Sequence, residues 1–319
     1  MTSSVVYFAG RMLARFVIML FLASVIIFVL LRAIPGDPAR IALGVTATDE
    51  SVAELSARLG TDRPLIAQYL DWMAGLLTGN FGISLASQQD ITPLMVDRAQ
   101  VSLILCGAAM VVSLLIAIPT GVYLARRDHR PDAAIVSAGT QLGIAVPSFL
   151  VGILLVAVFA VRLNWLPANG WVPPGQDFGA FVSHLVLPVI ALSLVQATIL
   201  TRYVRSAIVE ELHKDYIRTA RAGGSSTSEA LYRHALRNAA LPVLTVTGLQ
   251  LTSLIVGAVV IERVFVIPGL GSMLIDSVAN RDLTTVQTVM MLLVVFTLTV
   301  NLVVDVAYRV IDPRLRSRA

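Results

Sequence analysis

Long runs of uncharged, mostly apolar residues alternate with short charged segments along the chain. Six of these runs approach or exceed the roughly 20 residues that a helix needs to cross a bilayer. They cover residues 16–31, 101–125, 133–161, 185–201, 238–261 and 283–304. The pattern predicts an all-α, polytopic membrane protein with six transmembrane helices.

A cleaved signal peptide is the alternative for the first run. The run lies between Arg15 and Arg32, whose long side chains can reach the two membrane surfaces, and it lacks a small-residue cleavage site. We therefore expect an uncleaved membrane helix.

Residues 35–97 are polar and rich in turn-forming sequences. Two amphipathic segments stand out within them, and Pro64 is expected to start the second. Their apolar positions are Val52, Leu55 and Leu59, then Leu65, Ile66, Tyr69, Leu70, Met73 and Leu77. We predict a small helical insert outside the bilayer, which either caps the bundle or docks a partner. The first helix and the insert form one predicted domain, 1–97, and residues 98–319 form the other, a membrane core of five helices.

The charged segment 202–242 separates two apolar runs. Its first half has apolar residues at every fourth position, which predicts one amphipathic helix. These positions are Val204, Ile208, Leu212, Tyr216 and Ala220. The Gly223-Gly224 pair should end this helix, and Ser226 with Glu229 gives a capping box for the next one. We predict a helix-turn-helix between two membrane helices, although a basic amphipathic loop could also lie on anionic lipid.

Basic residues are unevenly distributed between the loops. Of the 24 lysines and arginines, 16 lie in segments 11–15, 126–130, 202–237 and 309–318. With six spans these segments share one side of the membrane. Because cytoplasmic loops carry the excess of basic residues, the loop 202–242 and both termini are predicted to be cytoplasmic and the insert external.

Composition and motifs exclude several functions. Hydrophobic residues make up 56% of the chain and charged residues 14%, well below the roughly 25% of soluble domains. Basic residues beside membrane spans do not indicate nucleic-acid binding. Lys214, the only lysine, does not follow a glycine as a P-loop lysine does, and the four histidines have neither metal-ligand nor hydrolase spacing. We expect a non-catalytic chain with no metal, no cofactor and no intrachain disulfide, because Cys106 is alone.

Several motifs carry a resemblance to a known family. Residues 218–224, RTARAGG, resemble the EAA loop of permease subunits of binding-protein-dependent ABC importers of the dipeptide and oligopeptide type, with Arg218 and Thr219 in place of the usual Glu and Ala. The insert, including the PGDP of residues 35–38, is similar to one found in this family. So are residues 262–271 and 280–282 in the last external loop, and residues 301–305 and 312–316 near the C-terminus.

This resemblance implies the transmembrane domain of a type I ABC importer in a bacterial inner membrane. Its partners would be a second homologous permease forming a heterodimer, two cytoplasmic ATPase subunits that bind ATP and Mg, and an external substrate-binding protein. The implied ATPase-coupling residues are Asp215, Tyr216, Ile217, Arg218, Thr219, Ala220, Arg221, Ala222, Gly223 and Gly224. The implied solute is a dipeptide or oligopeptide, with nickel, opines and glutathione as alternatives.

Polar residues and prolines within the spans are candidates for the transport pathway. Polar side chains in lipid usually face the bundle interior, where they either line a path or join helices. The candidates are Gln141, Pro147, Gln196, Gln250 and Asn301. A secondary transporter should instead carry an intramembrane carboxylate or histidine for ion coupling, and only Asp305, at a span end, comes close. A membrane enzyme is the other alternative, and the missing catalytic motifs argue against it.

Overall fold

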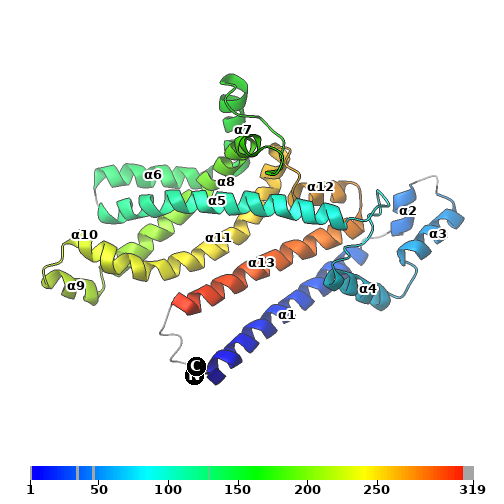
Figure 1. Cartoon of the computed structure of the whole chain (residues 1–319), viewed down its shortest axis with the longest axis horizontal. Coiled ribbons are helices and arrows are strands. Elements are labelled where there is room, and N and C mark those ends of the chain that lie inside the picture. The colour runs from blue at the N-terminus through cyan, green and yellow to red at the C-terminus, as the bar shows by residue number, and fades with distance from the viewer. Residues whose placement is uncertain (1, 34–35, 45–46, 129, 312–319) are drawn as a thin grey trace. The chain divides into compact units, whose positions relative to one another are not determined.

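The computed structural model describes residues 2–33, 36–44, 47–128 and 130–311 (Figure 1). Helices form the regular structure of these residues, apart from an isolated antiparallel bridge between Ile83 and Asp90. The predicted all-α fold is confirmed. Residue 35 of the PGDP motif and residues 312–316 of the C-terminal motif lie outside the described residues.

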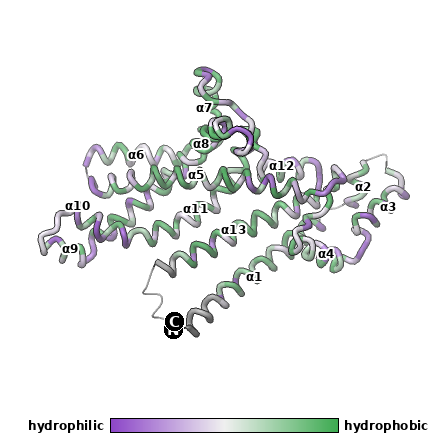
Figure 2. Tube along the Cα trace, viewed as in Figure 1, coloured by the Kyte–Doolittle hydropathy of each residue, from purple (hydrophilic) through white to green (hydrophobic). Residues whose placement is uncertain are grey.

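Within the described residues, five helices are long and apolar enough to cross a membrane. They are α1 (Thr2–Arg32), α5 (Thr92–Arg126), α8 (Phe178–Leu212), the segment Thr227–Val264, and α13 (Leu283–Ile311). The segment Thr227–Val264 comprises α10 (Thr227–Ala230), the π-helix η2 (Leu231–Ala235) and α11 (Leu236–Val264). In Figure 2 hydrophobic residues dominate α1, α5 and α13, whereas hydrophilic residues gather in α3 (Asp49–Leu59) and α9 (Asp215–Ala222).

The predicted run 133–161 is not one straight helix. It divides into α6 (Pro131–Ala145) and α7 (Ser148–Leu155), and α7 continues as the π-helix η1 (Val156–Arg162). The two parts meet at 98°. Val146 and Pro147 are both extended, with ψ of 119° and 141°. A proline disfavours helical backbone in the residue before it, which accounts for Val146. The sixth span therefore exists only as this bent pair. Three other prolines, Pro119, Pro188 and Pro242, lie inside continuous helices.

The chain divides into two compact units. The first contains Met1–Ser102 and Pro268–Thr299, and the second contains Leu103–Ile267 and Val300–Ala319. The first unit therefore holds the insert together with α12 (Leu270–Ala279) and most of α13.

The two predicted helices of the insert are present as α3 and α4 (Leu65–Thr78), and Pro64 directly precedes α4 as expected. A further short helix, α2 (Pro38–Leu43), begins where the Asp37 side chain accepts the Ala39 N–H. It packs on α3 through a small cluster of Ala39, Val52 and Leu55.

One buried carboxylate fastens the insert to the start of α13. Asp282 is 5% exposed and precedes the first residue of α13. Its Oδ2 accepts the hydroxyls of Ser84 at 2.5 Å and Thr285 at 2.7 Å, while its Oδ1 accepts the backbone N–H groups of Leu85 at 3.0 Å and Thr285 at 3.3 Å. The carboxylate thus caps α13 and holds a loop that lies 198 residues earlier in the chain.

In the second unit α8 packs against α6, α7 and α11. It also approaches α5 closely at Gly121, where a Cβ atom would lie 2.6 Å from the Val204 side chain. Such small residues let the backbones of membrane helices approach each other. The Ser113 hydroxyl of α5 adds a bond to the Ser193 carbonyl of α8 at 3.2 Å.

We expect Asp282→Ala to destabilise the first unit. Loss of the charged acceptor leaves the buried donors of Ser84 and Leu85 unpaired, at a cost of about 3 kcal/mol. Protease cleavage within residues 86–90 and a lower unfolding midpoint in detergent would report the loss. Asp62→Ala, which removes an exposed carboxylate from the same insert, is the control. Equal resistance of the two variants would show that Asp282 does not fasten the loop.

Candidate functional site

The charged segment 202–242 is not one helix followed by another. α8 ends at Leu212, Lys214 adopts extended backbone with ψ of 151°, and α9 starts at Asp215. The prediction of a single amphipathic helix across this point was wrong, since the break shifts the inward-facing register. Ile217 is 1% exposed, whereas Tyr216, assigned to the apolar stripe, is 37% exposed.

The turn after α9 depends on Gly224. Its φ is +97°, a conformation that L side chains rarely adopt, whereas φ of Gly223 is −78°. The Ser225 N–H donates to the Ala220 carbonyl at 3.1 Å. This is the 6→1 hydrogen bond of a Schellman motif, in which a left-handed glycine ends the helix. The Ser226 hydroxyl then accepts the Glu229 N–H at 3.1 Å, so the predicted helix start at Ser226 is confirmed. From Thr227 the helical path continues into α11.

A buried carboxylate, Glu211, joins α9 to both flanking helices. Glu211 is 7% exposed at the end of α8. Its Oε1 accepts the Lys214 ammonium at 2.5 Å, and its Oε2 accepts the Tyr216 hydroxyl at 2.5 Å. The Asn238 amide of α11 donates to the same Tyr216 hydroxyl at 3.0 Å. A chain of hydrogen bonds therefore runs from α8 through α9 to α11.

This network raises the pKa of two of its members. Burial, followed by the bond to the Glu211 carboxylate, raises the pKa of Tyr216 above its usual value. The hydrogen bond to the same carboxylate raises the pKa of Lys214. Tyr216 therefore stays a neutral donor and Lys214 a charged one at physiological pH. The sequence analysis did not single out Glu211, and its position three residues before the only lysine was the available signal.

Apolar packing holds α9 on the same helices. Ile217 belongs to a buried cluster with Val204 and Ile208 of α8, Leu231 of η2, and Ala239 of α11. The remaining predicted coupling residues lie outside this cluster. Ala220 is half-buried, and the exposed ones are Asp215, Tyr216, Arg218, Thr219, Arg221, Ala222, Gly223 and Gly224.

A second contact reaches this region from Arg126, the last residue of α5. The Arg126 guanidinium donates to the Ser228 hydroxyl at 2.9 Å and lies 5.7 Å from the centre of the Tyr232 ring. Arg126 therefore binds the helix that follows α9, which its position in a basic loop did not reveal.

The pathway candidates do not gather at one place. Gln196 is buried in α8, and its amide donates to the Gln250 carbonyl of α11 at 3.4 Å, a contact that joins two helices. Gln141 is exposed on α6 and lines a pocket of about 510 Å³ beside the 2.6 Å ion pair of Arg205 and Asp128. Pro147 forms the bend between α6 and α7, and Asn301 is half-buried in α13.

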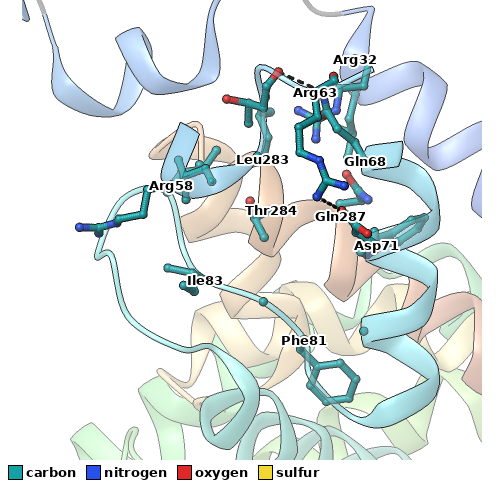
Figure 3. A pocket seen from close by; sticks show the side chains of 18 of the residues that line it. Arg32, Arg58, Arg63, Gln68, Asp71, Phe81, Ile83, Leu283, Thr284 and Gln287 are labelled. Atoms are coloured by element: carbon teal, nitrogen blue, oxygen red, sulfur yellow. Dashed lines mark hydrogen bonds and ion pairs between the residues drawn. The ribbon is translucent and has the colours of Figure 1, made fainter. Parts of the chain in front are cut away.

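The first unit has a pocket of about 430 Å³ between the end of α1, the insert and the start of α13 (Figure 3). Arg32, Arg63 and Gln68 line it together with Thr284 and Gln287. An ion pair joins Arg63 to Asp71 across one wall. The Gln68 amide donates to the carbonyls of Thr61 and Arg63, so these groups hold the loop before α4 in place. Among the described residues, no cluster of His, Cys, Asp or Glu could hold a metal ion.

Comparison with known proteins places the chain in a family. Residues 117–317 match the family described as the binding-protein-dependent transport system inner membrane component, and residues 5–106 match its N-terminal companion family. A probable peptide ABC transporter permease protein, y4tP of Sinorhizobium fredii, is 36% identical over 98% of this chain and 99% of its own length.

Two further relatives transport different solutes. The oligopeptide transport system permease protein AppB of Bacillus subtilis is 34% identical over 92% of this chain and 93% of its own. The glutathione transport system permease protein GsiC of Escherichia coli K12 is 36% identical over 93% and 94%, respectively.

A solved structure has a similar fold. The inward-facing MetNI methionine ABC transporter aligns with a TM-score of 0.59 at 18% identity, over 70% of this chain and 98% of that chain. Sequence motifs, relatives and fold agree with one another. The chain therefore belongs to the family of inner-membrane permease components of binding-protein-dependent ABC importers, as its motifs predicted.

Proposed function

We propose that this chain forms half of the translocation pathway for peptides or a similar small solute, and that α9 couples the pathway to separate ATPase subunits. The arrangement around α9 carries the proposal. One side of this short helix is fixed to two membrane-length helices by Ile217 and the Glu211 network, while its other side is polar and exposed. A helix held in this way can pass a push from a partner directly into α8 and α11.

The names of the relatives support the choice of solute, since two are peptide permeases and one transports glutathione, itself a small peptide. In this proposal ATP and Mg are bound by two cytoplasmic partner subunits. A second, homologous permease supplies the other half of the pathway, and an external binding protein delivers the solute. Movement of α9 then tilts α8 and α11 and alternates access to the pathway. An ion-coupled mechanism is not favoured, because the family match points to ABC importers.

The proposed membrane is the bacterial inner membrane, with both termini and α9 in the cytoplasm and the insert outside. Thiol labelling tests this topology in a Cys106→Ala background. A thiol at Thr227, beside α9, should react only with reagent on the cytoplasmic side. A thiol at Gln89, in the insert, should react only from outside. Both residues are exposed, so their reactivity reports the side of the membrane on which each one lies. The reverse pattern at both sites would invert the topology and remove α9 from the ATPase side.

Gly224→Val should uncouple the complex. A Cβ at Gly224 meets no atom within 4 Å, so the substitution adds no steric clash and acts only through the φ of +97°. A β-branched residue is strongly disfavoured there, and the angle between α9 and α10 must change. We expect normal membrane insertion but loss of most solute-stimulated ATP hydrolysis and uptake in vesicles that contain the complete complex.

Gly223→Ala is the matched control. Its φ of −78° suits alanine, and its Cβ would lie 3.4 Å from the Ala220 carbonyl oxygen, an ordinary contact. This variant should transport nearly normally. Normal transport by Gly224→Val would refute the coupling role of the turn. Loss of the variant from the membrane would instead make Gly224 a folding residue.

Tyr216→Phe tests the hydrogen-bond network. The change removes one donor from the buried Glu211 carboxylate and should cost about 1–2 kcal/mol of stability. Coupling is measured as the ratio of solute taken up to ATP hydrolysed. We expect this ratio to fall by more than the loss of stability explains. Tyr232→Phe, which removes a hydroxyl that only weakly accepts from Arg126 at 3.4 Å, is the control. An unchanged ratio in Tyr216→Phe would leave α9 coupled through Ile217 alone.

A further inference from the structure

The helix α4 of the insert has a surface that the proposed transport function does not use. α4 lies beside the Arg32 end of α1 in Figure 1. The Tyr69 hydroxyl and the buried Ser24 hydroxyl of α1 are 2.8 Å apart. The rings of Tyr69 and Trp72 pack on Phe28 of α1, with centroids 5.4 Å and 6.3 Å away. One face of α4 is thus fixed to a membrane span.

A different face of α4 is apolar and exposed. At 100° per residue, four residues fall within a sector of about 60°. They are Ile66, Leu70, Met73 and Leu77. Ile66 is 76% exposed, Leu70 is 59% exposed and Leu77 is 83% exposed, whereas Met73 is half-buried, and α4 contains no buried residue. A soluble domain rarely presents such a continuous apolar stripe to water.

Two polar residues of α4, Asp71 and Thr78, lie on a third face. Asp71 and Thr78 each follow a stripe residue directly, about 100° further round the helix. Asp71 pairs with Arg63, and both side chains are more than half exposed. α4 therefore has three faces: one against α1, one apolar and one facing water.

The contact with α1 fixes the depth of α4. Ser24 lies eight residues before Arg32, which places it about 12 Å inside the end of the span. At this level α1 presents exposed apolar side chains, among them Ile26, Val29 and Leu30, as expected of a lipid-facing helix. The stripe of α4 therefore adjoins an apolar surface that already belongs to the bilayer.

The length of α4 agrees with this placement. Its 14 residues are too few to span a membrane and match the length of interfacial segments.

We propose that α4 is a membrane-interface helix, whose stripe of Ile66, Leu70, Met73 and Leu77 is covered by lipid acyl chains in the leaflet at the Arg32 end of α1. With the topology proposed above this is the outer leaflet. The insert is then partly embedded in the membrane, and lipid holds it at a fixed height beside α1.

Spin labels on single cysteines test the proposal in the full chain with Cys106→Ala. The protein is reconstituted alone into vesicles of phosphatidylethanolamine and phosphatidylglycerol. Labels at Leu70 and Leu77 should be several-fold more accessible to oxygen than to a nickel chelate, at a depth of about 5–10 Å below the phosphates. Labels one residue further on, at Asp71 and Thr78, are the controls and should favour the nickel chelate.

Each other outcome overturns the proposal. Preference for the nickel chelate at all four sites would place the stripe in water. Protection of Leu70 and Leu77 from both reagents would show that protein covers it, either this chain or a second copy. Lipid-like signals that appear only after a binding protein is added would make that protein responsible. The measurement needs no ATPase and no solute, so it stands or falls separately from the transport function.

Discussion

The buried carboxylate of Glu211 is the constraint on which the organisation of the α9 region depends. A carboxylate that is 7% exposed must be neutralised or fully hydrogen-bonded, because burying an unpaired charge costs several kcal/mol. Lys214 and Tyr216 supply one donor to each oxygen. Lys214, three residues on, could reach Glu211 in a continuous helix, but Tyr216, five residues on, would point about 140° away. The Tyr216 hydrogen bond therefore goes with the departure from the helix at His213. The break before α9, the burial of Ile217 and the outward position of Arg218 all accompany that departure.

Periodicity could not predict this break. Val204, Ile208 and Leu212 do share the inward side of α8, as a repeat of four predicts, but the same repeat assigns Tyr216 to the core in place of Ile217. Extrapolating a period assumes that the helix continues, whereas α8 ends at Leu212 and Lys214 is extended. The turn at Gly224 could be predicted, because glycine is the residue type that adopts positive φ readily. Roles in coupling and transport stay predictions.

The membrane spans followed from composition, whereas their connections did not. Uncharged length predicted which runs form membrane-length helices. Proline chemistry alone did not predict the connections, because Pro147 divides its run while Pro119, Pro188 and Pro242 lie inside continuous helices. The bond from Asp282 to Ser84 joins residues 198 positions apart, and no local pattern encodes such a pair. In the same way, the apolar positions of α4 were visible in the sequence, but only the contact with Ser24 shows which of them face away from α1.

The continuity of α10, η2 and α11 has a mechanical consequence. The segment Thr227–Val264 has 38 residues and is about 57 Å long, nearly twice the roughly 30 Å of hydrocarbon that surrounds it. The uncharged residues 238–261 are the part expected within lipid, so residues 227–237, next to α9, are expected to project beyond the bilayer. A force applied at that end acts with leverage: if the segment pivots where the lipid holds it, a tilt of about ten degrees carries an end 30 Å from the pivot through roughly 5 Å, about one helical turn. If α9 receives such a force, as proposed, a partner movement of a few ångströms would shift the far end of the segment by a similar distance.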